Sequence, residues 1–172
     1  ADDLLAARAR LLLEQRAQAL ARRGHDVAVI MPLFQSCRRA GPLLEPLDLT
    51  VEAQLGYGKE YGRLWRSHLL GEPQVPVYFV EHNGLFDRDY KELGNTIYSY
   101  RGPDGEQHDY SDQLSRFAFF SKAVLNAIPV LGFWPEVLHA NDWHVGLIPV
   151  YLRVQYRADP RWRAVRSLLT IH

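Results

Sequence analysis

Short apolar runs that alternate with helical patterns constrain the fold of this chain more than any other feature. Two continuous runs, Val27–Met31 and Val75–Val80, have the length and character of strands buried on both faces. Two further strands are expected at Val137–His139 and Ser167–Ile171. The patterns that separate these strands predict helices over residues 2–23, 112–128 and 143–157. Alternating strands and helices predict an α/β fold with a mainly parallel sheet.

A β-hairpin is expected to extend this sheet. Residues 47–55 alternate apolar and polar side chains, as a half-buried strand does, and Gly56–Lys59 can turn the chain into a second strand at Glu60–His68. Residues 33–46 and 81–111 show no clear periodicity, so both are expected to be loops, and a strong turn signal occurs at Gly102–Gly105.

Composition limits the class of protein. A chain of 172 residues with 47% hydrophobic side chains suits one domain with a sizeable core, expected to span residues 1–172. A formal net charge of zero does not suit an electrostatic nucleic-acid binder. The single cysteine, Cys37, cannot form an internal disulfide. No apolar run approaches the roughly 18 residues of a membrane span, so we expect a cytoplasmic protein without nucleic-acid or membrane partners.

The segment from Val137 to His144 carries the densest group of functional side chains. A short apolar strand leads into a turn, and ligands collect at the carboxyl ends of strands in α/β sheets. Three interpretations fit this turn: a metal site, local hydrogen bonding with Asp142 capping the next helix, or a cluster that faces a ligand. The residues concerned are His139, Asn141, Asp142, Trp143 and His144.

His172 follows the last predicted strand and forms a second candidate. If that strand lies beside the Val137 strand, His172 and the Asp142–His144 turn could share one crevice, although a terminal residue could equally be frayed and inert. The chain has no Gly-x-Ser-x-Gly elbow, no Gly-x-Gly-x-x-Gly motif and no Walker motif. The sequence therefore signals neither a serine triad nor a phosphate cradle.

Five sequence blocks, taken in order, resemble the N-terminal half of the bacterial-type glycogen and starch synthases. A match to one block alone is weak evidence for the family, but five matches in the same order are a specific signal. The resemblance covers about residues 15–172, and residues 1–14 diverge from the family. The blocks are Ala19–Pro32, Val75–Val80 with Leu85–Arg88, Asp112 with Arg116–Ala123, Leu138–His144 with Leu147–Leu152, and Leu169–His172.

This resemblance implies a fold and an activity. It implies a partial N-terminal lobe of the two-lobe GT-B glycosyltransferase fold, with Rossmann-like lobes. It implies transfer of glucose, with retention, from ADP-glucose to the non-reducing end of an α-1,4-glucan, with no metal and no cofactor. His172 would be the catalytic histidine, and the substrate-binding residues would be His139, Asn141, Asp142, Trp143 and His144.

The chain also departs from the family pattern. The family begins with a strand and a Lys-x-Gly-Gly-Leu loop followed by an Asp, where this chain carries Arg8, Ala9 and Leu11. Because these residues cannot let a backbone approach a diphosphate as glycine does, we expect the isolated chain to bind ADP-glucose only if the missing parts are supplied, and to be inactive. The alternative is a non-catalytic glucan-binding or interaction module, and self-association through an exposed lobe surface is a further expectation.

Overall fold

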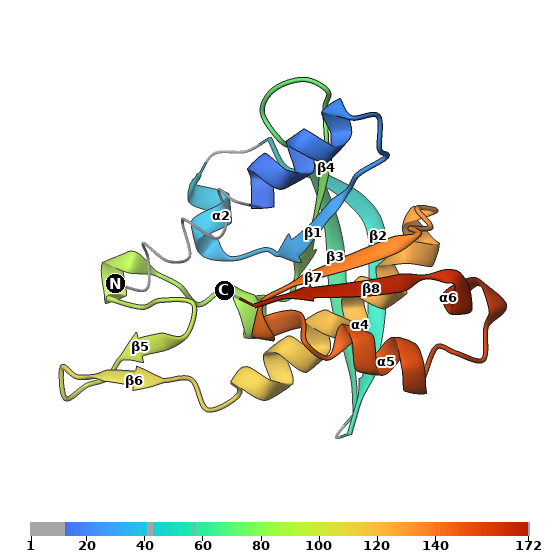
Figure 1. Ribbon diagram of the computed structural model, residues 1–172. Coiled ribbons are helices and arrows are strands. Elements are labelled where there is room, and N and C mark those ends of the chain that lie inside the picture. Colours follow the sequence, from blue (N-terminus) through green and yellow to red (C-terminus); the bar gives the residue numbers. More distant parts are fainter. Residues whose placement is uncertain (1–12, 41–42, 57, 172) are drawn as a thin grey trace. The chain divides into compact units, whose positions relative to one another are not determined.

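The computed structural model describes residues 13–40, 43–56 and 58–171 (Figure 1). The chain divides into two compact units. The first holds the described residues up to Leu49 together with Arg63–Ser111, and the second holds the described residues of Thr50–Gly62 and those from Asp112 onward. The expected helix start in residues 2–12, the diverged donor-loop positions and His172 lie outside the described residues.

A mixed sheet of four strands begins in the first unit, and its hairpin continues into the second. Strands β1 (Val29–Pro32) and β4 (Pro76–Glu81) run parallel, and β3 (Gly58–His68) pairs with β4 in the antiparallel sense. The strand order is β1-β4-β3-β2, with β2 spanning Glu45–Leu55. The buried-strand patterns and the added hairpin are therefore confirmed. The hairpin makes this sheet mixed, because it supplies two of its four strands.

A helix over residues 13–22 precedes β1. It ends at the predicted glycine, where the backbone N–H of Gly24 donates to the carbonyl oxygen of Ala21 at 2.9 Å. Gly24 has a φ of +86°, a left-handed conformation that side chains other than glycine rarely adopt. The helix stop read from the sequence is confirmed.

Both expected loops contain regular structure. A short helix, α2 (Gln35–Arg39), lies between β1 and β2. Residues 81–111 contain α3 (Asn83–Phe86), the 3₁₀ turn η1 (Lys91–Leu93) and a small antiparallel hairpin of β5 (Ser99–Arg101) and β6 (Gln107–Asp109). Elements of three to five residues are too short to show a hydrophobic period, so the loop prediction was wrong in these places.

The second unit is organised around α4 (Gln113–Leu131). Its inner face is apolar and buried, and it packs against α5 (Ile148–Val154), which in turn contacts β8 (Arg166–Thr170). Strand β8 pairs in parallel with β7 (Val137–Asn141) (Figure 1). Among the fully buried side chains of α4 are Phe119, Leu125 and Ile128.

Helix α4 is also long and apolar enough to cross a membrane by length and composition alone, which the sequence interpretation overlooked. Just over half of its most apolar window, 56%, is buried inside the protein. Ten of its residues are buried, as in the core helix of a folded domain. Helix α4 is therefore only a weak candidate for a membrane span.

The predicted helix over residues 143–157 is divided. It consists of the 3₁₀ turn η2 (Trp143–Val145) and α5, and a further helix, α6 (Pro160–Ala164), precedes β8. Proline is favoured in the first turn of a helix and disfavoured further along it, because it lacks an N–H group and clashes with the preceding turn. Pro149 and Pro160 therefore begin new helices, and a single helix through Pro149 was wrong.

Candidate active site

The carboxyl ends of β7 and β8 lie at the same edge of their parallel pair. Asn141 is in register with Thr170, and the backbone N–H of Asp142 donates to the carbonyl oxygen of Thr170 at 2.6 Å. The last strand, β8, therefore lies beside the Val137 strand, as a shared crevice for His172 and the Asp142–His144 turn requires. His172 itself lies two residues beyond Thr170 and outside the described residues.

Asp142 forms the sharp turn that follows β7. Its backbone has a φ of +69° and a ψ of 175°, a region that is almost confined to glycine. One carboxylate oxygen accepts a hydrogen bond from the backbone N–H of Trp143 at 2.7 Å. Asp142 therefore caps the following turn, which was one of the three interpretations of this segment, but the element it caps is η2 rather than a long α-helix.

Trp143 and His144 form an aromatic stack at this turn. Their ring centroids are 4.2 Å apart with planes inclined by 26°, and the Trp143 side chain is 52% exposed. Phe117 of α4 meets both rings edge-on, with centroids 5.0 Å from Trp143 and 4.6 Å from His144. Trp143 therefore packs against two rings and still presents half of its surface to solvent.

Burial controls the charge of His144. Desolvation lowers the pKa of His144 below its usual 6.5; nearby Asp142 acts to raise it and Arg116 acts to lower it further. The net result favours the neutral imidazole at neutral pH. A neutral ring can donate from one nitrogen and accept at the other, so His144 can serve a sugar hydroxyl in either sense.

The other two predicted residues lie on β7. A ring nitrogen of His139, Nε2, is 2.8 Å from the hydroxyl of Thr170, and the side-chain amide of Asn141 donates to the carbonyl oxygen of His139 at 3.1 Å. Both side chains therefore support the strand ends. Within residues 13–40, 43–56 and 58–171, no three His, Cys, Asp or Glu side chains gather as a metal site requires.

Sequence reasoning missed two neighbours of this turn. Arg116 is a fully buried charged residue on α4, and its guanidinium lies over the Phe117 ring at 5.4 Å. Phe117 lies in the predicted helix over residues 112–128, and it supports both rings of the aromatic stack. An arginine within an otherwise apolar helical face was the available signal, because such a residue is rarely buried without a partner.

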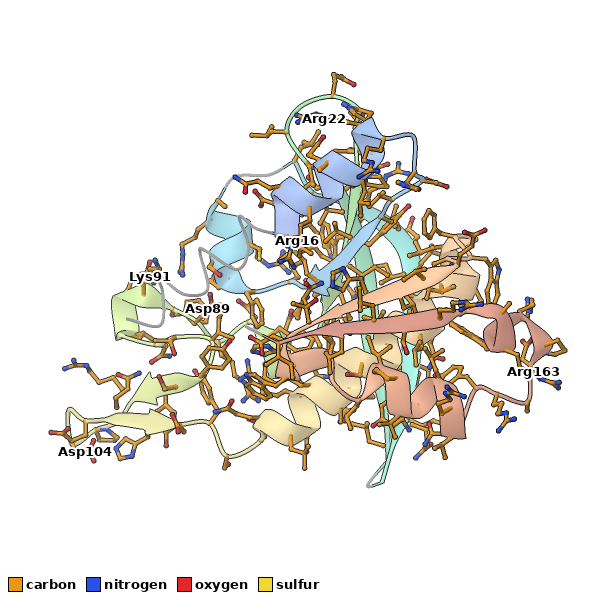
Figure 2. All side chains as sticks on the ribbon, viewed as in Figure 1. Arg16, Arg22, Asp89, Lys91, Asp104 and Arg163 are labelled. Carbon is orange, nitrogen blue, oxygen red and sulfur yellow. The ribbon has the colours of Figure 1, made fainter. Side chains whose placement is uncertain are left out.

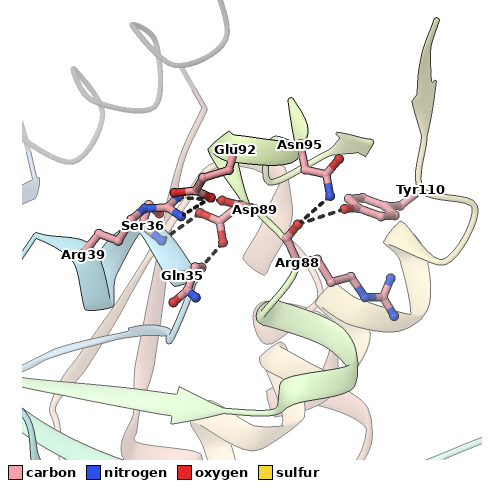
Figure 3. A network of polar contacts seen from close by, with 8 residues as sticks. All are labelled: Gln35, Ser36, Arg39, Arg88, Asp89, Glu92, Asn95 and Tyr110. Carbon is pink, nitrogen blue, oxygen red and sulfur yellow. Dashed lines mark hydrogen bonds and ion pairs between the residues drawn. The ribbon is translucent and has the colours of Figure 1, made fainter. Parts of the chain in front are cut away.

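The first unit carries a separate polar network, centred on Asp89 (Figure 3). The buried carboxylate of Asp89 accepts from the backbone N–H groups of Gln35 at 2.7 Å and Ser36 at 2.9 Å. The guanidinium of Arg39 donates to the carbonyl oxygen of Asp89 at 2.7 Å and lies 3.5 Å from Glu92. These contacts connect α2 to the segment after α3 and stabilise the fold, so we assign the network a structural role.

Comparison with known proteins identifies the family. The family model of the starch synthase catalytic domain matches residues 12–172. Glycogen synthase of Syntrophotalea carbinolica is 40% identical over 155 residues, which are 90% of this chain and 29% of that enzyme. Glycogen synthase 1 of Geobacter metallireducens is 37% identical over 155 residues, covering 89% of this chain and 28% of that enzyme.

A solved structure shows the same fold. The catalytic domain of starch synthase IV from Arabidopsis thaliana, bound to ADP and acarbose, has a TM-score of 0.69 over 91% of this chain at 24% identity. The chain covers 28% of that protein, and it spans less than a third of the length of the curated relatives. The α/β class and the place of this chain within a GT-B lobe are confirmed. With its sequence matched from residue 12 onward, the chain belongs to the starch synthase catalytic domain family.

Proposed function

We propose that this chain is part of the acceptor-side lobe of a retaining glucosyltransferase, which moves glucose from ADP-glucose to the non-reducing end of an α-1,4-glucan. The observation that carries the proposal is the family match over residues 12–172. The capped Asp142 turn supports it, because that turn presents Trp143 and His144 where α/β proteins bind ligands.

The chemistry of glucosyl transfer fits these side chains. The reaction passes through an oxocarbenium-like state, which fixed polar groups stabilise better than mobile water does. An exposed indole can stack on a sugar face, while a neutral imidazole and a carboxylate can bind hydroxyl groups. In this proposal His172 acts at the transferred sugar, and His139 and Asn141 hold the strand ends that position the Asp142 turn.

A chimaera tests the proposal directly. Residues 12–172, which the family model matches, would replace the corresponding segment of the Syntrophotalea carbinolica glycogen synthase, which would keep its own donor loop and second lobe. Incorporation of labelled glucose from ADP-glucose into glycogen would be measured. We expect an active chimaera whose activity falls at least about tenfold in separate Trp143→Ala and His172→Ala variants.

Leu70→Ala in the same chimaera is the control, because Leu70 is 98% exposed and distant in sequence from the turn. A soluble chimaera that binds ADP but transfers no glucose would refute the proposed role of this segment. Equal activity in the Trp143→Ala, His172→Ala and Leu70→Ala variants would refute the assigned residues.

The 172-residue chain alone is expected to transfer no glucose, because it spans only 29% of the length of its glycogen synthase relative. Incorporation above that of a His172→Ala control would contradict this expectation. In the proposed enzyme, ADP-glucose is a donor substrate, no cofactor or metal takes part, and the site of action is the cytoplasm.

Glucan binding without transfer is the second candidate function. It is favoured by the exposed indole of Trp143 and the exposed ring of Tyr61, both in the second unit. The chain should then sediment with glycogen, and Trp143→Ala should abolish that co-sedimentation. Absence of binding by the unaltered chain would remove this candidate.

A further inference from the structure

Positive charge is concentrated in one stretch of a chain whose formal net charge is zero. Between Val145 and Ile171 there are five arginines and one acidic residue, Asp159. All five arginines are exposed. The asymmetry is a property of the second unit, because the stretch runs from η2 through α5 and α6 to β8.

One of these arginines, Arg161, lines an open depression, and three others are connected to its surroundings. Its volume is about 280 Å³, near the lower end for ligand sites, and it is lined by Trp134, Pro135, Glu136, Arg161, Ala164 and Val165. The Nε of Arg163 donates to the carbonyl oxygen of Arg157 at 3.0 Å, so these two residues are neighbours. The backbone N–H of Arg166 donates to the carbonyl oxygen of Glu136 at 2.9 Å. Figure 2 labels Arg163 among the nitrogen-bearing side chains around α6.

We name this surface the basic face and define it by Trp134, Arg157, Arg161, Arg163 and Arg166. Only Arg161 is paired within it: its guanidinium binds the Asp159 carboxylate, with the Nη2 atom at 2.7 Å. Among the described residues, the guanidinium groups of Arg157, Arg163 and Arg166 form no ion pair. Their charges are therefore available to an anionic partner.

The centre of the basic face is the Trp134 ring, which is held by contacts within the protein. The guanidinium of Arg161 lies over the Trp134 ring at 4.5 Å, and buried Trp162 packs against Trp134 with centroids 5.1 Å apart. Asp159 fixes Arg161 in turn, because it also accepts from the Arg161 backbone N–H at 2.9 Å. A partner would therefore lose little free energy in ordering this surface.

These features favour a protein partner over a nucleic acid or a glucan. A base or a sugar ring stacks on an open aromatic face, whereas the Trp134 ring already contacts the Arg161 guanidinium and the Trp162 ring. An apolar floor bordered by unpaired arginines instead suits an aliphatic side chain flanked by carboxylates, and Trp and Arg are the residues that dominate protein interfaces. Charge complementarity would also accelerate association.

We propose that the basic face docks an acidic protein segment that inserts one aliphatic side chain into the Trp134 depression. The depression lies at the amino ends of β7 and β8, since residues 134–136 and 164–165 immediately precede them. The Asp142 turn lies at the other end of the same strands, about 15 Å away for five residues. Both sites can therefore be occupied at once, and the inference is independent of the proposed transfer activity.

The test is a fluorescence-anisotropy titration of the full chain with a labelled peptide of glutamates around a central leucine. We expect saturable binding that weakens with added salt, because the Debye length shortens. Arg163→Gln combined with Arg166→Gln should weaken binding by about tenfold or more, and Trp134→Ala should do so separately. Arg101→Gln and Leu70→Ala remove an exposed charge and an exposed apolar side chain elsewhere, and should change nothing.

Circular dichroism would verify that each variant is folded. If Trp134→Ala does not fold, the binding of the peptide to the double arginine variant still tests the proposal. Three results would overturn the proposal: equal binding of a glutamine version of the peptide, tighter binding of single-stranded DNA of matched charge, or tighter binding of maltoheptaose. Absence of any peptide binding to the unaltered chain would overturn it as well.

Discussion

At the scale of single residues, Asp142 shows how a side chain compensates for an unfavourable backbone. Its φ of +69° and ψ of 175° would suit glycine, yet the carboxylate offsets part of the strain by binding the backbone N–H of Trp143. A glycine would relax the turn and lose that bond. The residue thus combines strain with a specific hydrogen bond at the point where the candidate site begins.

Substitution at position 142 separates these two effects. Asp142→Ala loses the cap and keeps the strain, so it should lower the free energy of unfolding by about 2 kcal/mol. Asp142→Gly loses the same carboxylate without the strain and should cost about 1 kcal/mol less. Urea unfolding of the two variants would measure the difference. Equal losses would show that the backbone at Asp142 is not strained.

His144 should make stability depend on pH. Burial lowers its pKa in the folded chain below 6.5, so the unfolded chain binds the proton more readily. The contribution of His144 to stability is therefore full above about pH 6.5 and decreases as the pH falls toward the lowered value. His144→Gln should flatten the unfolding free energy between pH 7 and pH 5. An unchanged slope in His144→Gln would contradict this assignment.

At the scale of elements, local sequence predicted the long segments and failed for the short ones. The buried strands, the β2–β3 hairpin and α4 followed from periodicity, because each repeats its pattern over several residues. Helix α2 is too short to show such a pattern. Its first two backbone N–H groups donate to the Asp89 carboxylate, more than fifty positions along the chain. No local rule reveals a partner at that separation.

In the candidate site, too, local features could be predicted from the sequence and contacts between distant residues could not. The Asp142 turn and its cap could be predicted, because a strand end followed by a capping residue is a local signal. The contacts of Phe117 and Arg116 with that turn could not, since they depend on how α4 packs against η2. The division of residues 143–157 could have been predicted, because Pro149 marks a helix start, and Pro160 marks the start of α6 in the same way.

Loss of Asp89 should therefore release α2. Asp89→Ala leaves two backbone N–H groups of α2 without acceptors, which should lower the free energy of unfolding by about 2–3 kcal/mol. Asp89→Asn retains one carbonyl acceptor and should recover part of the loss. Asp104→Ala is the control, because Asp104 also accepts a backbone N–H, from Glu106, but on an exposed hairpin. Hydrogen exchange of the α2 amides would locate the effect, and exchange unchanged in Asp89→Ala would contradict it.

At the scale of the whole molecule, the strands are distributed over two units. Strand β8 is an edge strand of the second unit. Within the described part of the chain, β8 pairs with β7 alone. Its apolar side chains are exposed on both faces, with Leu168 at 52% and Leu169 at 39%. An edge strand with exposed leucines is a template for pairing with another strand.

The 172-residue chain should consequently self-associate in a concentration-dependent manner. Leu168→Lys places a charge on the β8 edge and should shift the equilibrium toward the monomer in sedimentation velocity experiments. Leu70→Lys is the matched control, because Leu70 is 98% exposed and belongs to the first unit, whereas β8 belongs to the second. A purely monomeric unaltered chain, or an identical response of the two variants, would contradict association through β8.

The stack of Trp143 on His144 gives the candidate site a built-in optical reporter. An indole 4.2 Å from an imidazole loses fluorescence when the imidazole gains a proton, because the charged ring accepts an electron from the excited indole. Replacing Trp65, Trp134 and Trp162 by phenylalanine would leave Trp143 as the single emitter. Its brightness would then follow the ionisation of His144, and a sugar that covers the exposed half of the indole would shift its colour toward the blue.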